Sequence, residues 1–379
     1  LLTAAFYFFY LGYKYGKKKH YLLFYAAMGL AVLTKGIIGA AIPLFTVFLF
    51  LLFKKELKKS LEICLIPGIL IILIISLPWY LAEWWLHGDK FVEFALGFLF
   101  MSRFKGVVAG HPGPWYYYFL ALILGFAPWS HFLPYGLVRT WKERRTDPAL
   151  LTLCFIIPVF VVFSMARTKL PSYLLPLYPF LAIMVGRLWD RFMSKEKAGM
   201  KIGMLISNLL LAAVVALLII GFIILGTNNY SGQYAALMPQ LLLLAGVLIG
   251  GSVLSIGAFL AGKYDFSFFS LPVMVFIIAF ILVTQTLPAV EKFKGTRELA
   301  VKVAVVTLPD ELIAAYDVGN RPGIVYYNKK PILFLKSEKD LKKFTALKLG
   351  YCYITAGTYE RIKDWAEILD RRGDLVVVY

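Results

Sequence analysis

The sequence has few of the residues that build disulfide frameworks or metal sites. It contains three cysteines and four histidines among its 379 residues. Cys64 and Cys154 lie in apolar runs and Cys352 lies in a polar tail, so no two cysteines show the spacing of a pair. No Cys/His combination has metal-site spacing either. A small disulfide-stabilised domain and a zinc module are therefore excluded, and no metal ligands are assigned.

Acidic residues are also scarce. The 22 Asp and Glu residues are outnumbered by 40 Lys and Arg, which gives a net charge of +18. Such a surplus can indicate a nucleic-acid-binding protein. The chain is, however, 60% hydrophobic with a mean hydropathy of +0.75, whereas a soluble domain is rarely more than about half apolar. We therefore predict an all-α polytopic membrane protein, with the lipid bilayer and not nucleic acid as its partner.

About ten transmembrane helices are predicted from runs that approach or exceed the roughly 18 residues needed to span a bilayer. The first run is partial, because Lys14 follows only 13 residues, and neither an initiator Met nor a signal peptide precedes it. We expect the chain to be a fragment, or a product whose upstream part is encoded elsewhere. The predicted spans are 1–13, 21–34, 37–53, 60–82, 116–138, 149–165, 171–189, 202–226, 239–261 and 268–288.

Basic residues gather in alternate loops along the chain. They follow the first, third, fifth and seventh predicted spans, near residues 14–19, 54–59, 139–145 and 187–201. Lys and Arg mark cytoplasmic loops, so the loops between these must face outside. One of them is the long loop 83–115, whose apolar stretch with scattered charges is expected to form a helix along the interface. The sequence thus predicts a multi-pass protein of the inner (plasma) membrane.

The composition changes after Pro288. Residues 289–379 carry many charges and no run long enough to span. We predict a transmembrane domain at 1–288 and a small α/β domain at 289–379 on the extracytoplasmic side, without the Gly-rich loop of a nucleotide site. The expected strands are "ELIAAYDV", "GIVYYN", "PILFL", "GYCYIT" and "DLVVVY", and the expected helices are "TRELAVKVAVV", "SEKDLKKFTAL" and "TYERIKDWAEIL".

Several cations run against the charge rule, because they fall in loops predicted to face outside. They are Lys35, Arg103, Lys105, Arg167 and Lys169. A single cation at an interface usually extends toward lipid headgroups. Cations from separate outer loops would, if the loops converge, form an anion pocket at the outer membrane surface. Arg suits bidentate phosphate contact and Lys supplies a compact charge, so the expected anion is a phosphate on a lipid.

Aromatic residues accompany these cations. "GHPGPWYYYF" places His111 before a span and Tyr118 at its start, and Tyr173 follows the second outer cation pair. These residues fit an interfacial aromatic belt, or a platform that binds a sugar or isoprenoid. Pro171 and Pro176 would interrupt a regular helix and expose backbone beside a cavity.

Three stretches, in this order, resemble a known family: "GLAVLTKGIIGAAIPL" (29–44), "SRFKGVVAGHPGPWYYYFLALILGFAPWSHFLP" (102–134) and "RTKLPSYLLPLYPFLAIMVGR" (167–187). They are similar to the bacterial aminoarabinose transferases, and more broadly to the protein-mannosyltransferase-type glycosyltransferases of the C superfamily. The sequence resemblance is good over roughly residues 1 to 190. Beyond them, the later spans and the C-terminal domain resemble the family in architecture only. Such enzymes move a sugar from a polyprenyl phosphate, such as undecaprenyl phosphate, to an acceptor at the outer face of the membrane.

The resemblance implies that Lys35 and Arg103 lie in the donor phosphate pocket and that Lys169 and Tyr173 line the cavity. The family often has a His three residues before the matched Arg-Phe pair, where this chain has Phe100. That departure weakens any statement about the acceptor, or shifts the role to His111.

The resemblance also implies that the catalytic carboxylates lie upstream of Leu1. The outer carboxylates that remain in the membrane part are Glu83, Asp89 and Glu93, which we interpret as structural or solvated. No cofactor is assigned. The superfamily leaves a divalent metal open, but this stretch has no cluster of carboxylates to hold one.

Three functional hypotheses follow. The first is a glycosyltransferase that uses a polyprenyl-phosphate sugar as its donor and modifies a glycolipid such as lipid A, or a protein; aminoarabinose, mannose and galacturonic acid all fit the pocket. The alternatives are a transporter or flippase for an anionic lipid, and a non-catalytic fragment that requires its upstream part. In the first hypothesis Lys35, Arg103, Arg167 and Lys169 bind the donor phosphate, and the substrates are positioned by His111, Tyr118 and Tyr173.

Overall fold

The structure is a computed structural model that describes residues 1–93, 113–194, 197–227, 237–319 and 321–379. It divides into two compact units. Unit 1 comprises Leu1–Val214 and Ser255–Leu271, and unit 2 comprises Val215–Leu254 and Pro272–Tyr379. The domain boundary predicted from composition, between residues 288 and 289, stays a prediction.

Unit 1 is helical in its described part. Its N-terminal helices are α1 (Leu2–Tyr15), α2 (Lys18–Lys35), α3 (Ile38–Phe53), η1 (Leu57–Leu61), α4 (Leu65–His87) and α5 (Asp89–Val92). After the gap follow α7 (Tyr117–Gly125), η3 (Trp129–Phe132), α8 (Leu133–Lys142), α9 (Asp147–Met165), η4 (Pro171–Leu177) and α10 (Tyr178–Ser194). The remaining long helices, which run through both units, are α11 (Lys197–Thr227), α12 (Met238–Leu260) and α13 (Tyr264–Ile281).

Buried aromatic rings join the helices of unit 1 that are far apart in sequence. Phe6 of α1 lies 4.9 Å from Phe155 of α9, measured between ring centroids, and Phe155 lies 4.4 Å from Phe180 of α10. Phe9 of α1 meets Phe50 of α3 edge-on at 5.9 Å. A buried aromatic side chain of this size removes roughly 150–250 Å² of surface from contact with its solvent. These contacts fix α1, α3, α9 and α10 as one packed group.

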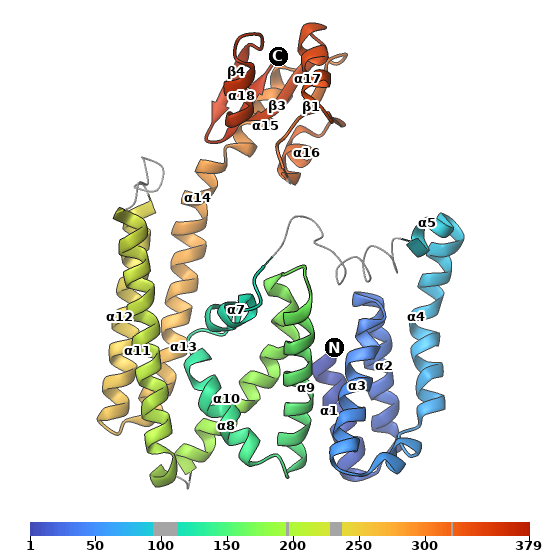
Figure 1. Cartoon of the computed structure of the whole chain (residues 1–379), viewed down its shortest axis with the longest axis vertical. Helices are drawn as coiled ribbons and strands as arrows, with labels where there is room; N and C mark the ends of the chain where they lie inside the picture. Colours follow the sequence, from blue (N-terminus) through green and yellow to red (C-terminus); the bar gives the residue numbers. More distant parts are fainter. Residues whose placement is uncertain (94–112, 195–196, 228–236, 320) are drawn as a thin grey trace. The chain divides into compact units, whose positions relative to one another are not determined.

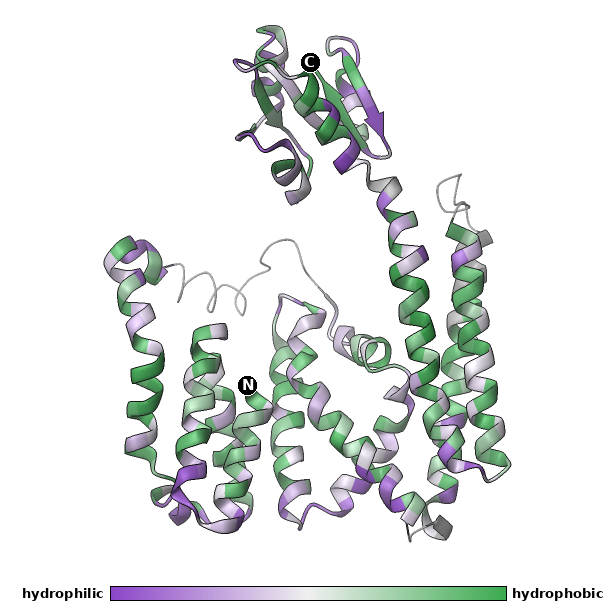
Figure 2. Cartoon of the chain, turned by 180° about the vertical axis from the view of Figure 1, so that it is seen from behind, coloured by the Kyte–Doolittle hydropathy of each residue, from purple (hydrophilic) through white to green (hydrophobic). Residues whose placement is uncertain are grey.

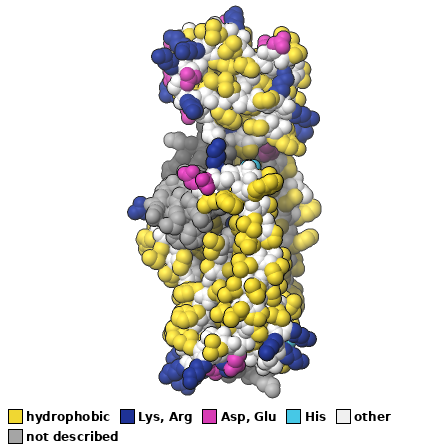
Figure 3. Space-filling model, turned by 90° about the vertical axis from the view of Figure 1, so that its right-hand side faces the viewer, with side chains coloured by type: hydrophobic (Ala, Val, Ile, Leu, Met, Phe, Trp, Pro, Cys, Tyr) yellow, Lys and Arg dark blue, Asp and Glu magenta, His cyan; other side chains and the backbone are white. Residues whose placement is uncertain are grey.

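The basic loops of unit 1 gather at one end (Figure 1). The connections after α1, α3, α8 and α10 lie there, whereas α2, α4 and α9 end at the opposite side. Hydrophilic residues accumulate at the lower end of the same helices (Figure 2). Figure 3 shows a band of hydrophobic side chains above the Lys and Arg side chains of this end. The alternation of basic loops in the sequence therefore corresponds to one shared end in space.

In the described residues, six helices are long and apolar enough to cross a membrane. They are the helices at Leu65–His87, Asp147–Met165, Pro171–Ser194, Gly199–Leu217, Met238–Leu260 and Tyr264–Glu291. The predicted span 116–138 is instead α7 followed by η3 and α8, bent by 116° at a break. Counting this bent pair gives seven spans. The count of about ten is not confirmed: α1 and α3 have only 14 and 16 residues, and α2 is not among the helices that qualify as spans.

The C-terminal part of unit 2 is a small α/β domain. α14 (Leu287–Lys294) continues the span of α13 toward this domain, whose own helices are α15 (Thr296–Val306), α16 (Pro322–Asn328), α17 (Glu338–Ala346) and α18 (Ala356–Ile362). Its strands are β1 (Leu312–Ala315), β2 (Ile332–Phe334), β3 (Gly350–Thr355), β4 (Ile368–Arg372) and β5 (Leu375–Val378), in the spatial order β2-β1-β3-β5-β4. β2 and β3 pair with β1 in parallel, whereas β5 pairs antiparallel with β3 and β4.

Two hydrophobic cores lie on opposite faces of this sheet. Leu299 of α15 and Ile324 of α16 pack with Tyr353 on one face. Leu341 and Phe344 of α17 pack against the other face. Successive strand residues point to opposite faces, which is why neighbours on β3 enter different cores. Both faces of the sheet are therefore covered by helices.

Two elements of this domain differ from the sequence-based expectation. "GIVYYN" is not a strand but helix α16, which begins at Pro322; Pro is favoured in the first turn of a helix. "TYERIKDWAEIL" is helical only as α18, and its end opens into β4. The helix "SEKDLKKFTAL" is confirmed as α17, where the Ser337 hydroxyl accepts the backbone N–H of Asp340 at 3.2 Å.

The ion pair between Lys302 and Asp370 predicts a pH-dependent contact in this domain. Lys302 Nζ lies 2.7 Å from Asp370 Oδ2, and this hydrogen bond holds the pKa of Asp370 below its usual 3.8. Because the carboxyl pKa is lower in the folded than in the unfolded state, the ion pair stabilises the folded protein at pH values above the unfolded-state pKa. This stabilisation is lost as the pH falls through the lower, folded-state pKa. Both side chains are partly exposed, so we expect less than about 1 kcal/mol.

Hydrogen exchange of the β4 and β5 amides would measure this contribution. Asp370→Asn should increase exchange relative to the natural protein at pH 5, and the two proteins should converge near pH 3. Asp364→Asn, which changes an exposed carboxylate of the same domain, is the control and should exchange like the natural protein at both values. An equal difference at both pH values would contradict the prediction.

Candidate functional site

Two of the predicted phosphate-binding cations are exposed at the end of unit 1 opposite the basic loops. Lys35 is the last residue of α2, which ends at Gly36 with φ 71°. Arg167 follows α9 in the short connection to η4. Figure 1 shows that α2 and α9 end on the same side of unit 1. Among the described residues, no carboxylate forms an ion pair with either cation, so both can meet an anion from outside.

Arg103 and His111 lie outside the described residues, as do Lys105 and Phe100. Their predicted roles stay predictions. The expected interfacial helix of the loop 83–115 falls largely on the same stretch. Its described beginning continues α4 to His87 and adds the single turn α5.

Lys169 is buried, with 4% of its surface exposed. Its Nζ donates to the carbonyl oxygens of Ser164 at 2.5 Å and Phe163 at 3.3 Å, both in the last turn of α9. The last carbonyls of a helix lack partners within the helix and carry partial negative charge. Lys169 therefore closes the end of α9. Burial lowers the pKa of this lysine below its usual range.

Tyr118 holds the segment that carries Lys169. Its side chain is fully buried, and its hydroxyl accepts the backbone N–H of Leu170 at 3.2 Å. Its ring also faces the Lys169 ammonium at 5.1 Å from the centroid, which is a cation–π distance. Tyr118 was predicted to contact substrate. In the structure it contacts Lys169 and Leu170, and its role in substrate binding stays a prediction.

Tyr173 lies on the other side of the same segment. It is half-buried in η4, and its ring packs against that of Phe163 at 5.2 Å. Pro171 opens this 3₁₀-helix and Pro176 lies inside it. A proline cannot donate the backbone hydrogen bond of a regular helix. The two prolines therefore separate α9 from α10, as the sequence predicts, by an element without α-helical hydrogen bonds.

Gly113 is a residue of this cluster to which the sequence assigns no role. A Cβ atom at this position would lie 2.6 Å from Cγ of Lys169 and 3.0 Å from its Cβ. Real side-chain contacts are not this short, so only glycine lets the backbone pass over the lysine stem. The motif "HPGPW" contains this glycine, but a pattern of residues does not show which distant side chain lies beneath it.

The remaining outer carboxylates do not gather into a cluster. Glu83 lies 3.4 Å from His87 one turn along α4, between Oε2 and Nε2. Asp89 begins α5 and Glu93 follows it. Within the described residues, no three His, Cys, Asp or Glu side chains are placed to hold a metal ion.

The close approach of Gly113 to Lys169 can be tested by a double-mutant cycle. Gly113→Ala should lower the melting temperature of the detergent-solubilised protein, because overpacking of this kind costs about 1–3 kcal/mol. In a Lys169→Ala background, which has no Cγ, the same change should cost much less. Gly186→Ala on α10, where nothing lies within 4 Å of the new methyl group, is the control. Equal costs of Gly113→Ala in both backgrounds would contradict the contact.

Sequence comparison relates the chain to named arabinosyl transferases. It is 35% identical over 206 residues to the undecaprenyl phosphate-α-4-amino-4-deoxy-L-arabinose arabinosyl transferase 2 of Proteus mirabilis, covering 51% of this chain and 35% of the relative. It is 34% identical over 233 residues to transferase 1 of Pseudomonas fluorescens, covering 60% and 40%. An uncharacterised Aquifex aeolicus protein is 28% identical over 339 residues, covering 88% and 61%. No protein-family model matches the chain.

Structural comparison relates the fold to a solved transferase. The crystal structure of ArnT from Cupriavidus metallidurans bound to undecaprenyl phosphate matches 95% of this chain and 68% of that one, with a TM-score of 0.67 and 21% identity. The apo structure matches with a TM-score of 0.73 and 20% identity. The chain spans between about a third and three fifths of the length of the curated relatives above. The predicted resemblance to the aminoarabinose transferases is thus confirmed in sequence and in fold.

Proposed function

We propose that this chain, which is aminoarabinose transferase-like in sequence and in fold, is part of a glycosyltransferase that uses a polyprenyl-phosphate sugar. Two relatives are named as undecaprenyl phosphate-α-4-amino-4-deoxy-L-arabinose arabinosyl transferases, and one matched solved structure holds undecaprenyl phosphate. The observation that carries the proposal is that Lys35 and Arg167, at the end of unit 1 opposite the basic loops, are exposed and form no ion pair with any described residue. The proposed acceptor is a glycolipid such as lipid A, or a protein.

The chemistry of transfer explains why cations are needed there. The bond between the sugar and the phosphate breaks as the acceptor attacks the anomeric carbon, and negative charge develops on the departing phosphate. Fixed positive groups stabilise that charge. Lys35 and Arg167 are exposed and available for this role, and we assign Arg103 to it as well. His111 would contact the sugar or the acceptor.

Lys169, Tyr118 and Tyr173 have a different part in the proposal. The Lys169 ammonium is already bound by two carbonyl groups, and Tyr118 is buried beneath it. We propose that both position the loop that presents Arg167, with Lys169 adding its charge to the field at the phosphate. Tyr173 remains half-exposed and would line the cavity. A base is required unless the acceptor is itself an anion, and we place it outside this chain.

The proposed membrane topology follows from the same geometry. The end of unit 1 that carries the basic loops would lie in the cytoplasm, and the cation site would lie at the outer surface. α1, α2 and α3 would then also cross the membrane within the helical group, which gives the count of about ten spans. The α/β domain at 289–379 would lie on the outer side.

Substitution of Lys35 would test the phosphate assignment. In the full-length protein, Lys35→Ala should reduce transfer from a radiolabelled polyprenyl-phosphate sugar by about 10²–10³-fold, the effect typical of removing one stabilising donor. The melting temperature should not change, because Lys35 is exposed. Lys58→Ala, which removes an exposed lysine at the basic-loop end, should keep full activity.

The outcomes separate the competing functions. Undiminished transfer by Lys35→Ala would overturn the pocket assignment. Movement of the lipid across vesicles without any glycosyl transfer by the natural protein would instead show a flippase.

A further inference from the structure

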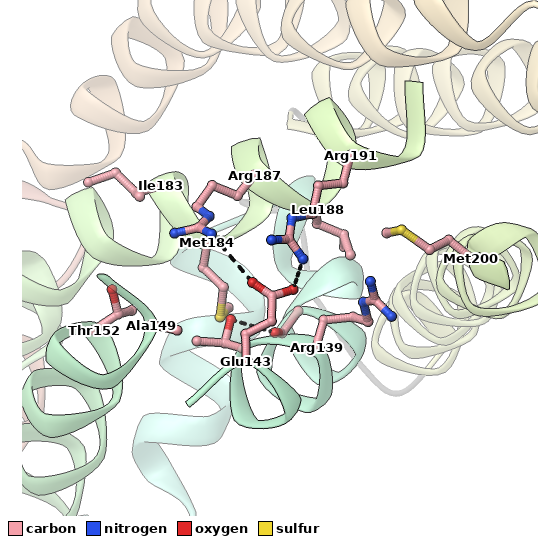
Figure 4. A pocket seen from close by; sticks show the side chains of 12 residues that line it. Arg139, Glu143, Ala149, Thr152, Ile183, Met184, Arg187, Leu188, Arg191 and Met200 are labelled. Atoms are coloured by element: carbon pink, nitrogen blue, oxygen red, sulfur yellow. Dashed lines mark hydrogen bonds and ion pairs between the residues drawn. The ribbon is translucent and has the colours of Figure 1, made fainter. Parts of the chain in front are cut away.

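A second group of cations lies in a pocket at the basic-loop end of unit 1, far along the helices from Lys35 and Arg167. The pocket is bordered by α8, α9, α10 and the start of α11 (Figure 4). Arg139 comes from α8, and Arg187 and Arg191 come from α10. The apolar part of the wall is formed by Ala149, Ile183, Met184, Leu188 and Met200. The sequence assigns these arginines to loop charge alone.

Among the described residues, two of these arginines contact the same carboxylate. Glu143 Oε2 lies 3.4 Å from Arg187 Nη2, and Glu143 Oε1 pairs with Arg191 Nη1. Arg187 and Arg191 are four residues apart, so they project from one face of α10, and Figure 4 shows both directed at Glu143. Only 18% of the glutamate side chain is exposed, against 39% and 32% for the two arginines. Arg187 and Arg191 together carry one positive charge more than Glu143 neutralises.

The combination of surplus charge and apolar wall indicates the kind of ligand. Guanidinium groups bind phosphate oxygens through paired hydrogen bonds. Methionine and leucine side chains next to them suit a hydrocarbon chain. Basic pockets between transmembrane helices on the cytoplasmic side bind the headgroups of acidic lipids. A free phosphate ion would use the charge and leave the apolar wall without a function.

We propose that this pocket binds the phosphate of an acidic phospholipid from the leaflet at the basic-loop end. The headgroup phosphate bridges the outer edges of Arg187 and Arg191 and lies near Arg139. One acyl chain runs along Ile183 and Met184. Glu143 orients the two arginines and competes with the phosphate for their N–H groups. The site is independent of the glycosyltransferase proposal, because it lies at the other end of unit 1.

Native mass spectrometry of the full chain in detergent would test this site, with phosphatidylglycerol and phosphatidylcholine as probes. The natural protein should retain phosphatidylglycerol in preference to phosphatidylcholine. The double variant Arg187→Gln/Arg191→Gln should bind it at least about tenfold more weakly, since each charge-assisted hydrogen bond contributes a factor of this order. Lys142→Gln/Arg145→Gln removes two exposed cations from the same end and should bind like the natural protein. Equal weakening by both double variants would show general surface attraction and overturn the proposal.

Glu143→Gln gives a second test that does not depend on the folding of the arginine variant. It removes the competing charge, so phosphatidylglycerol affinity should rise several-fold while the arginines remain. If the ion pair is purely structural, Glu143→Gln should lower the melting temperature and leave the lipid affinity unchanged. That result would overturn the proposal. Displacement of the lipid by millimolar inorganic phosphate, with equal protection of the protein, would identify a free-anion site and refute the lipid assignment.

Discussion

The contacts that two lysines make with the two ends of α9 are the interactions on which the rest of unit 1 depends. At the N-terminus of α9, Asp147 forms an ion pair with Lys54, at 2.7 Å between Oδ1 and Nζ, and the hydrogen bond that Lys54 donates to this carboxylate raises the pKa of Lys54. At its C-terminus, the ammonium of Lys169 binds the carbonyls of Ser164 and Phe163. Carboxylates favour the positive end of a helix and cations the negative end. Both lysines come from outside the helix, so α9 is tied to α3 on one side and to the loop before η4 on the other.

The two ends of unit 1 use cations in different ways. At the basic-loop end, Lys54, Arg187 and Arg191 meet carboxylates, and the arginines exceed the charge they neutralise. At the opposite end, the Lys169 ammonium donates its hydrogen bonds to backbone carbonyls, whereas Lys35 and Arg167 remain exposed. A polar group buried in a membrane needs a partner within the protein, whereas an exposed cation stays available to a ligand. The presence or absence of a partner within the protein therefore distinguishes lysines and arginines with a structural role from those that are candidates for ligand binding.

Part of the fold could be predicted from patterns that are local in the chain. The long apolar runs became α4, α9, α12 and α13, and "TRELAVKVAVV" became α15, because hydrophobic length and period act over neighbouring residues. The predictions failed where distant contacts decide. "GIVYYN" has strand-like residues, yet Asn328 at its end is buried against the hydroxyl of Tyr353 on β3, at 3.0 Å, and the segment is helical. The run 116–138 has the length of a span, yet it bends at its middle.

For the candidate site, the sequence by itself determined which residues run against the charge rule and that Arg167 and Lys169 share one short connection between helices. Charge sign and spacing are properties of the chain, so they can be read without coordinates. Only the tertiary structure decided that Lys169 turns inward to the α9 carbonyls while Arg167 stays exposed. It also decided that the ring of Tyr118 lies beneath the Lys169 ammonium. Those outcomes depend on groups 5 to 52 residues away in the sequence, and a hydrogen bond forms only between atoms that folding brings within reach.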